Sequence, residues 1–246
     1  MTLPSKRKAD LRRRLTAGAD EHRKCAIIGC PCPTTASRGS GLNRLYCRRH
    51  EEHHERHGSY LKSSYSAAQL APYRAAALRT LREYQKDTRV HRARLGIETL
   101  YAAAGMPVDA FRLRGLSPEE RARAAWARLR QDKVDPLVPL SEWLALSAVI
   151  RDDSQPDHRN EFRLVQAGKL IHRLAGGSHR RWERERPGGA VEVIELHRYP
   201  ASRGRVLRHL GERLDRAAET LEPLLSDLRA AEAPPRQSAR KSSQPL

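Results

Sequence analysis

Hydrophobic side chains recur at helical spacing through most of the chain after residue 65. The first run steps by three and four residues, through Leu70, Tyr73, Ala77, Leu81 and Tyr84. This spacing places the five side chains on one face of a helix, and a serine just before the run can cap its N-terminus. A second helix is expected over about 89–104, where a glycine at 105 ends it. The pattern therefore predicts a protein built mainly from amphipathic helices.

Four further stretches complete the expected helical body. Ser117 followed by Pro118 and two glutamates is a typical helix start. The stretch 137–150 is apolar nearly all round, which predicts the most deeply buried helix. Another helix is expected directly after His158. Residues 190–196, AVEVIEL, alternate between apolar and polar positions and form the one convincing strand.

The last predicted helix carries a stripe of apolar residues at heptad spacing: Leu207, Leu210, Leu214, Ala217, Leu221, Leu224 and Leu228. Such a stripe can pair two chains as a coiled coil, so a homodimer through this helix is one interpretation. Packing on the chain's own body is the other. Pro223 interrupts the stripe and can kink the helix.

A shorter motif lies at 100–115, LYAAAGMPVDAFRLRG. It predicts a helix, a tight turn and a second helix that opens at Pro107, an outline similar to a helix-turn-helix. Tyr101 argues against that interpretation, because it is bulky at a position where close helix packing usually needs a small residue.

The net charge of the chain indicates what kind of partner it binds. The chain has 47 Lys and Arg against 29 Asp and Glu, a formal net charge of +18. Such a field favours polyanions, and we expect nucleic acid, DNA in the first place. No apolar stretch is long enough to span a membrane, and the basic N-terminus lacks the apolar run of a secretory signal. We therefore expect a cytoplasmic protein with no membrane partner, in which thiols stay reduced.

All four cysteines lie close together near the N-terminus. Four residues separate Cys25 from Cys30, and two separate Cys47 from His50. Zinc takes four sulfur or nitrogen ligands in a tetrahedron, and two short ligand pairs supply them. The intervening loop is polar and rich in glycine and serine, so only a metal could close it. The sequence predicts a structural Zn²⁺ held by Cys25, Cys30, Cys47 and His50.

Two alternatives to this ligand set remain open. Cys32 could replace Cys30, although the prolines on either side of it stiffen the chain away from the turn before Cys30. His53 or His54 could replace His50 one turn along the predicted helix. We favour Cys30 and His50, and interpret the later histidines as helix surface.

The pattern resembles a short zinc element of bacterial and phage proteins, where it occurs beside HNH-type endonuclease domains. The matching residues are Cys25, Cys30, Gly41, Leu42, Cys47, His50, Arg56, His57 and Gly58. This chain differs in its extra cysteine and in a longer loop between the pairs. The resemblance implies zinc and a nucleic-acid context, and it implies no activity.

These features divide the chain into four expected parts. Residues 1–24 form a basic disordered arm, and 25–62 form the zinc-binding knuckle. A helical body follows over 66–230, and 231–246 form a disordered tail. The predicted fold class is mainly α, with a small zinc-stabilised N-terminal knuckle, a multi-helix body and at most one short hairpin or strand.

Arginines in three places are the candidate nucleic-acid contacts. Some lie on the helix that the metal would fix, some beside Trp182, and some in the acid-free stretch 197–210. They are Arg48, Arg49, Arg56, Arg180, Arg181, Arg203, Arg205 and Arg208.

Three functions are consistent with the sequence. We favour non-enzymatic nucleic-acid binding, because four protein ligands leave the zinc no open position for a reacting water. A nuclease or recombinase-type accessory enzyme would use the acidic loop Asp152, Asp153, Asp157 and His158, whose letters with Asn160 and His172 imitate an HNH site. A helical scaffold that dimerises through 205–228 is the third.

Overall fold

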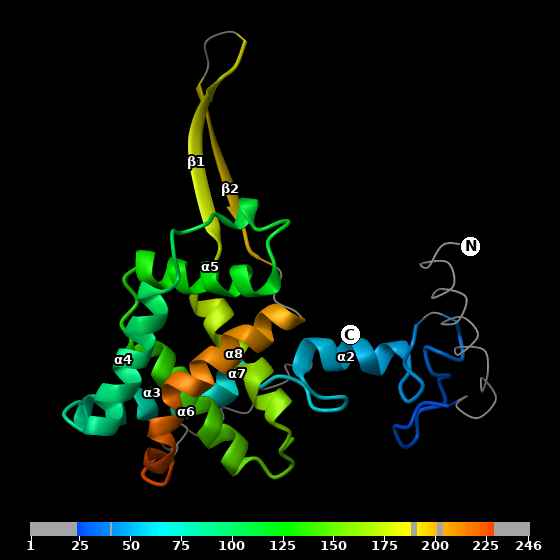
Figure 1. Ribbon diagram of the computed structural model, residues 1–246. Coiled ribbons are helices and arrows are strands. Elements are labelled where there is room, and N and C mark those ends of the chain that lie inside the picture. Colours follow the sequence, from blue (N-terminus) through cyan, green and yellow to red (C-terminus); the bar gives the residue numbers. More distant parts are fainter. Residues whose placement is uncertain (1–23, 40, 188–190, 201–203, 229–246) are drawn as a thin grey trace, which may run out of the picture. The chain divides into compact units, whose positions relative to one another are not determined.

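The protein divides into two compact units, Met1–Ser63 and Ser64–Leu246 (Figure 1). This computed structural model describes residues 24–39, 41–187, 191–200 and 204–228. The predicted tail at 231–246, Arg203 and all but the last residue of the predicted arm lie outside this range. Within it, seven α-helices and a single two-stranded sheet confirm the mainly α fold class. None of these helices is both long and apolar enough to cross a bilayer.

The first unit contains one described helix, α2 (Arg48–His57), preceded by turns and loop. Cys47 is its N-cap, and Gly58 ends it in the left-handed conformation, with φ at 73°. Only two hydrophobic residues described in this unit are buried, Cys25 and Cys47, and neither joins a hydrophobic core cluster. Apolar packing therefore gives the described part of this unit little stability.

The second unit is a bundle of helices with one hairpin. Its helices are α3 (Ala67–Glu83), α4 (Thr88–Ala102), α5 (Pro118–Gln131), α6 (Leu137–Asp152), α7 (Asn160–Leu174) and α8 (Arg205–Ala218), with 3-10 turns η1 (Ala110–Arg112) and η2 (Glu219–Leu225). Ser66 and Ser117 open α3 and α5 with reciprocal side-chain caps, as predicted.

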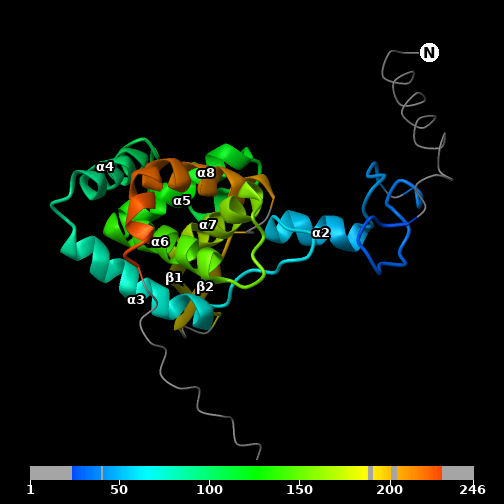
Figure 2. The same cartoon turned by 90° about the horizontal axis from the view of Figure 1, so that it is seen from below.

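Helix α6 lies among the other helices of this bundle (Figure 2). It contacts α3, α7, α8 and α4, and both Trp143 and Leu144 are fully buried on it. This confirms the prediction of a buried helix, which followed from the lack of a polar face.

Helices α7 and α8 pack backbone against backbone. A Cβ atom at Gly168 would overlap the carbonyl of Leu207, and one at Gly211 would overlap the carbonyl of Leu164. The two glycines thus let each helix approach the other more closely than any side chain would allow.

The apolar stripe of the last helix packs inside the chain. All six of its leucines are buried: Leu207, Leu210, Leu214, Leu221, Leu224 and Leu228. The α-helix ends at Ala218 and continues as the 3-10 turn η2, which contains Pro223. One α-helix was expected to carry the whole stripe, and this was wrong after Ala218. Pro223 lacks the N–H that an α-helix needs at that position.

Strands β1 (Ser178–Glu185) and β2 (Val191–Arg198) form an antiparallel hairpin that projects from the helices (Figure 1). The alternation at 190–196 predicted β2. No alternating pattern indicates β1, which is almost entirely charged or polar and, among the described residues, pairs with β2 alone. Both faces of the hairpin are largely exposed.

The described segment 100–115 forms no helix-turn-helix, in line with the objection from Tyr101, and the second helix expected to open at Pro107 is also absent. Only η1 follows Pro107 in this segment. Gly105 takes φ of 76°, and its carbonyl accepts a hydrogen bond from Arg130 of α5. The N–H of Ala110 donates to Ser178 Oγ at 2.8 Å. The segment is thus fastened to α5 and to the hairpin as a loop.

Replacing Gly168 by Ala should lower the free energy of unfolding by about 3 kcal/mol or more, because the methyl group meets rigid backbone. The matched change is Gly96→Ala in α4, where the new Cβ would lie 3.1 Å from the Cβ and 3.2 Å from the Cα of Ala217, against 2.0 Å from the Leu207 carbonyl oxygen at Gly168. There the gain in helix propensity offsets a small shift, so stability should change by less than about 1 kcal/mol. Urea unfolding followed by tryptophan fluorescence measures both. Equal losses would contradict the close α7–α8 approach.

Candidate metal centre

A tight turn brings Cys25 and Cys30 to one place. The N–H of Cys30 donates to the carbonyl of Ile27 at 3.0 Å, and Gly29 takes φ of 79° between them. A left-handed residue is needed at this point of the turn, and glycine adopts it without strain. Gly29 therefore shapes the turn that precedes Cys30.

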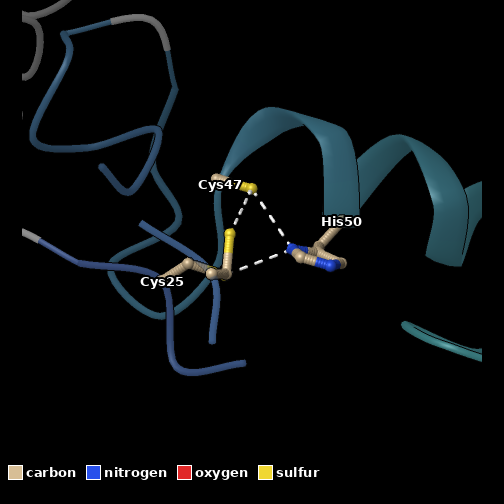
Figure 3. Close-up of side chains that lie close together, drawn as sticks. Cys25, Cys47 and His50 are labelled. Atoms are coloured by element: carbon tan, nitrogen blue, oxygen red, sulfur yellow. Dashed lines mark hydrogen bonds between the residues drawn. The ribbon is translucent and has the colours of Figure 1, made fainter. Parts of the chain in front are cut away.

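Helix α2 presents the second pair. Cys47 stands at the N-cap and His50 in the first turn, where the N–H of His50 donates to the carbonyl of Cys47 at 3.0 Å. Residues three apart on a helix lie on the same face, so both side chains turn toward Cys25 (Figure 3).

The four predicted ligands form one cluster. His50 Nδ1 lies 3.3 Å from Cys25 Sγ and 3.3 Å from Cys47 Sγ, and Cys30 Sγ lies 3.9 Å from Cys47 Sγ. All four donor atoms lie within 4.8 Å of one another. Tetrahedral coordination with ordinary metal–sulfur and metal–nitrogen bonds places donors about 3.5–3.8 Å apart. The cluster could therefore hold a metal ion at its centre.

The surroundings of the donors adjust their protonation. Burial raises the pKa of the Cys25 thiol. At Cys47 burial has the same tendency, but the nearby N–H of His50 and the thiols of Cys30 and Cys25 outweigh it, so the pKa is lowered. Burial, with Arg49 and His53 nearby, lowers the pKa of His50. A metal binds the thiolate and the neutral imidazole. The lowered pKa values of Cys47 and His50 therefore favour binding, and the raised pKa of Cys25 opposes it.

The alternative ligands have other roles. Cys32 lies outside the cluster, and its carbonyl accepts the N–H of Cys25 at 2.9 Å. His53 Nδ1 lies 2.7 Å from the carbonyl of Ser59, and its ring stacks on His57. His54 also stays outside the donor set.

An aromatic stack that the sequence did not reveal supports the cluster. The ring of Tyr60 lies between His54 and Tyr46, with centroid distances of 4.3 Å and 3.7 Å. Tyr46 is next to the candidate ligand Cys47, so the stack joins both ends of α2. No spacing rule in the sequence links a residue before the helix to one after it.

Backbone hydrogen bonds fold the loop between the ligand pairs. Thr35 N donates to Tyr46 O at 3.1 Å, and Ala36 N donates to Asn43 O at 3.0 Å. Thr35 is buried, and a Cβ at Gly41 would lie 2.9 Å from its Oγ1. Glycine at 41 is therefore required by close packing against Thr35.

The arginines of α2 differ in their surroundings. Glu52 pairs with Arg48 at 2.9 Å and with Arg56 at 3.4 Å, whereas Arg49 is exposed at the first turn. A groove beside the cysteine cluster is lined by Cys32, Pro33, Thr35, Arg38, Cys47, Arg48 and Arg49. Arg38 was missing from the predicted contacts, because its place in the middle of the polar loop gives no periodic signal.

The remaining predicted arginines belong to the second unit. Arg180 pairs with Asp109 and lies 5.1 Å from the centre of the Phe111 ring, while Arg181 is on the opposite face of the hairpin, 3.6 Å from Glu195. Arg208 pairs with Glu161, and Arg205 is exposed at the start of α8. The hairpin therefore does not present Arg180 and Arg181 as one surface.

The carboxylates of the acidic loop all have partners in the structure. Asp153 accepts the Tyr65 hydroxyl at 2.7 Å, Asp152 accepts the Tyr73 hydroxyl at 3.1 Å, and Asp157 pairs with Arg159 at 2.7 Å. Of the candidate metal groups in the described residues, none includes these acids. The contacts of Asp152 and Asp153 tie α3 and the residue before its cap to the end of α6, whereas the pair of Asp157 with Arg159 is local to the start of α7.

His172, the last letter of the HNH imitation, is buried on α7. Burial, together with Arg128 and Arg121, lowers its pKa from 6.5 to about 4. The folded protein thus keeps this imidazole neutral where the unfolded chain would protonate it.

We expect this histidine to make the second unit less stable in acid. Above pH 6.5 the imidazole is neutral in both states and costs no stability. As the pH falls from 6.5 toward 4, the unfolded chain binds a proton that the folded protein does not, and the free energy of unfolding falls by about 3 kcal/mol in all. His172→Gln should flatten the pH dependence of unfolding in that window, whereas His158→Gln, at an exposed position, should not. Urea unfolding followed by the fluorescence of buried Trp126 and Trp143 provides the measurement. The same slope in all three proteins would contradict the assignment.

Cys30→Ser and Cys32→Ser make a matched test of the donor set. Cys30→Ser removes a ligand and should weaken metal binding by more than about a hundredfold, since second-shell changes alone cost 10–100-fold. Cys32→Ser should leave the affinity unchanged. Titration of the metal-free chain with Co²⁺, followed by thiolate charge-transfer absorption, reports both. A larger loss in Cys32→Ser would mean that the wrong cysteine has been assigned.

Comparison with known proteins places the chain in no group: no family matches it, and neither curated proteins nor solved structures give a match.

Proposed function

We propose that the chain is a zinc-stabilised protein that binds nucleic acid, DNA in the first place, and acts by binding and not by catalysis. The metal step rests on the donor set. Three sulfurs and one imidazole nitrogen are a combination that Zn²⁺ takes in structural sites. With all four positions supplied by protein, the metal retains no position for a reacting water.

The packing of the first unit also supports a structural metal. The described part of this unit adds no side chain to the hydrophobic core clusters, and its loop between Cys30 and Cys47 is polar. Ordering such a loop costs conformational entropy that apolar burial does not offset here. A metal bound at both ends of the loop supplies the missing free energy.

The observation that carries the nucleic-acid step is the groove beside the metal cluster. Three arginines, Arg38, Arg48 and Arg49, line it together with neutral residues. Guanidinium groups bind phosphate with paired hydrogen bonds, and a rigid backbone lowers the entropy cost of each contact. Because the N-cap of α2 is the ligand Cys47, the metal also fixes the backbone that carries Arg48 and Arg49.

The ion pair between Arg48 and Glu52 is compatible with this role. Both side chains are exposed, at 77% and 44%, so the pair contributes little stability and its partners exchange readily. The net charge of +18 strengthens the attraction of any polyanion at long range. The resemblance to zinc elements beside HNH-type endonuclease domains suggests the same context, that of a bacterial or phage protein associated with DNA.

Binding of the full chain to a labelled DNA duplex should weaken steeply as salt rises, because phosphate contacts release counterions. The double variant Arg38→Ala, Arg49→Ala should bind more weakly and reduce the log–log salt slope by about 2, roughly one for each arginine. Arg92→Ala removes an exposed arginine of α4 and should bind as the wild type does. Fluorescence anisotropy with duplex and single-stranded probes measures all three.

Either of two results would contradict the proposal. A flat salt dependence would mean that phosphates are not contacted. An equal loss in Arg92→Ala would mean that only overall charge matters and that the groove is not the contact. Tighter binding to the single strand would retain the groove but change the substrate from duplex to single-stranded nucleic acid.

A further inference from the structure

The hairpin brings a second set of metal-binding side chains together. His179 of β1 stands directly opposite His197 of β2, and their side chains are therefore on the same face. Glu195 is two residues before His197 and shares that face, because side chains alternate along a strand. The cluster combines two imidazoles with one carboxylate.

Their donor atoms are close enough for one ion. The rings of His179 and His197 are stacked, with centroids 3.9 Å apart and planes 4° apart. His179 Nε2 lies 3.9 Å from Glu195 Oε2, and one donor atom from each of the three residues lies within 4.8 Å of the others. The stacked rings would have to rotate apart to turn all three donor atoms toward a common centre.

The start of β1 is held in place on both sides of His179. Ser178 accepts the N–H of Ala110 at 2.8 Å, and Arg180 pairs with Asp109. The first turn η1 therefore holds the backbone that carries His179, and the ladder to β2 fixes His197 opposite. This arrangement lowers the entropy that a metal would have to remove on binding.

We propose that His179, Glu195 and His197 form a second metal site, separate from the cysteine cluster and selective for a divalent transition metal such as Zn²⁺, Co²⁺ or Ni²⁺. Imidazole nitrogens suit these ions, whereas Mg²⁺ and Ca²⁺ prefer oxygen ligands. Three protein ligands leave at least one position to water or to another small ligand.

The structure also shows what the metal would displace. Glu195 contacts Arg181 at 3.6 Å, and this exposed pair contributes little to stability. The side chains of His179 and Glu195 are both 48% exposed, so an ion reaches them without any unfolding. We therefore expect reversible binding at the hairpin, weaker than at the buried thiols.

The test uses the full chain with zinc already in the cysteine cluster. Titration with Co²⁺ should show uptake of one further equivalent, with the weak d–d bands of nitrogen and oxygen ligands and no thiolate charge-transfer absorption. His197→Ala should weaken this uptake at least tenfold, and Glu195→Gln should weaken it less. His91→Ala removes an exposed histidine of α4 and should leave it unchanged.

Hydrogen exchange separates loss of the site from loss of the hairpin. Zn²⁺ should slow exchange of the amides of 178–185 and 191–198 in the wild type, because binding stabilises the folded hairpin. It should not slow them in His197→Ala, whose exchange without metal should match the wild type.

No uptake beyond the cysteine cluster, or equal uptake in His197→Ala, would overturn the proposal. Thiolate absorption from the added Co²⁺ would do so as well, because it would place the ion at a cysteine. If instead the cysteine cluster binds no metal, the metal-free chain titrated with Co²⁺ shows no thiolate absorption, which is a different result.

Discussion

The convergence of three sulfurs and one imidazole is the constraint on which the described part of the first unit depends. Its described residues bury almost no apolar side chain, so the usual source of folding free energy is small here. Backbone hydrogen bonds such as Thr35 to Tyr46 shape the loop, but each contributes only about 1 kcal/mol net. The donor cluster joins the two ends of that loop and also sets the start of α2. The same four residues therefore position Arg48 and Arg49 beside the neighbouring groove.

The second unit reaches stability by a different route. Its helices bury a continuous apolar core, and Gly168 and Gly211 allow α7 and α8 to pack at backbone distance. The leucines of α8 and η2 are used within this core. A dimer through that stripe would first have to expose it, at a cost of about 1.5–3 kcal/mol for each leucine. The hairpin takes no part in this core, and its two faces carry different kinds of side chain. Arg180 and Trp182 are on one face, and the pair His179 and His197 is on the other.

Local signals in the sequence were enough for most of the helices and for the grouping of the cysteine cluster. Ser66 and Ser117 predict their helix starts because a cap and its partner lie within four residues, and the ligand pairs are equally short-range. Features set by distant contacts could not be predicted. Strand β1 has no alternating pattern of its own, and the segment after Pro107 is held as a loop by contacts with α5 and the hairpin. The His179–His197 pair depends on strand register, which charged β1 does not specify.

The net charge can be counted from the sequence, but the ion pairs that occupy individual arginines are known only from the structure. Arg48, Arg56, Arg180, Arg181 and Arg208 each contact a carboxylate. Such pairs leave the net charge of +18 unchanged, so the long-range attraction for a polyanion persists. These ion pairs do, however, limit the places where a phosphate could bind an arginine without first displacing a carboxylate. By that criterion the groove beside the metal cluster, where Arg38 and Arg49 lie among neutral residues, is better suited than the hairpin, where Arg180 is already held by Asp109. Attraction is thus a property of the whole chain, whereas the proposed phosphate contact would depend on the few guanidinium groups beside the cysteine cluster.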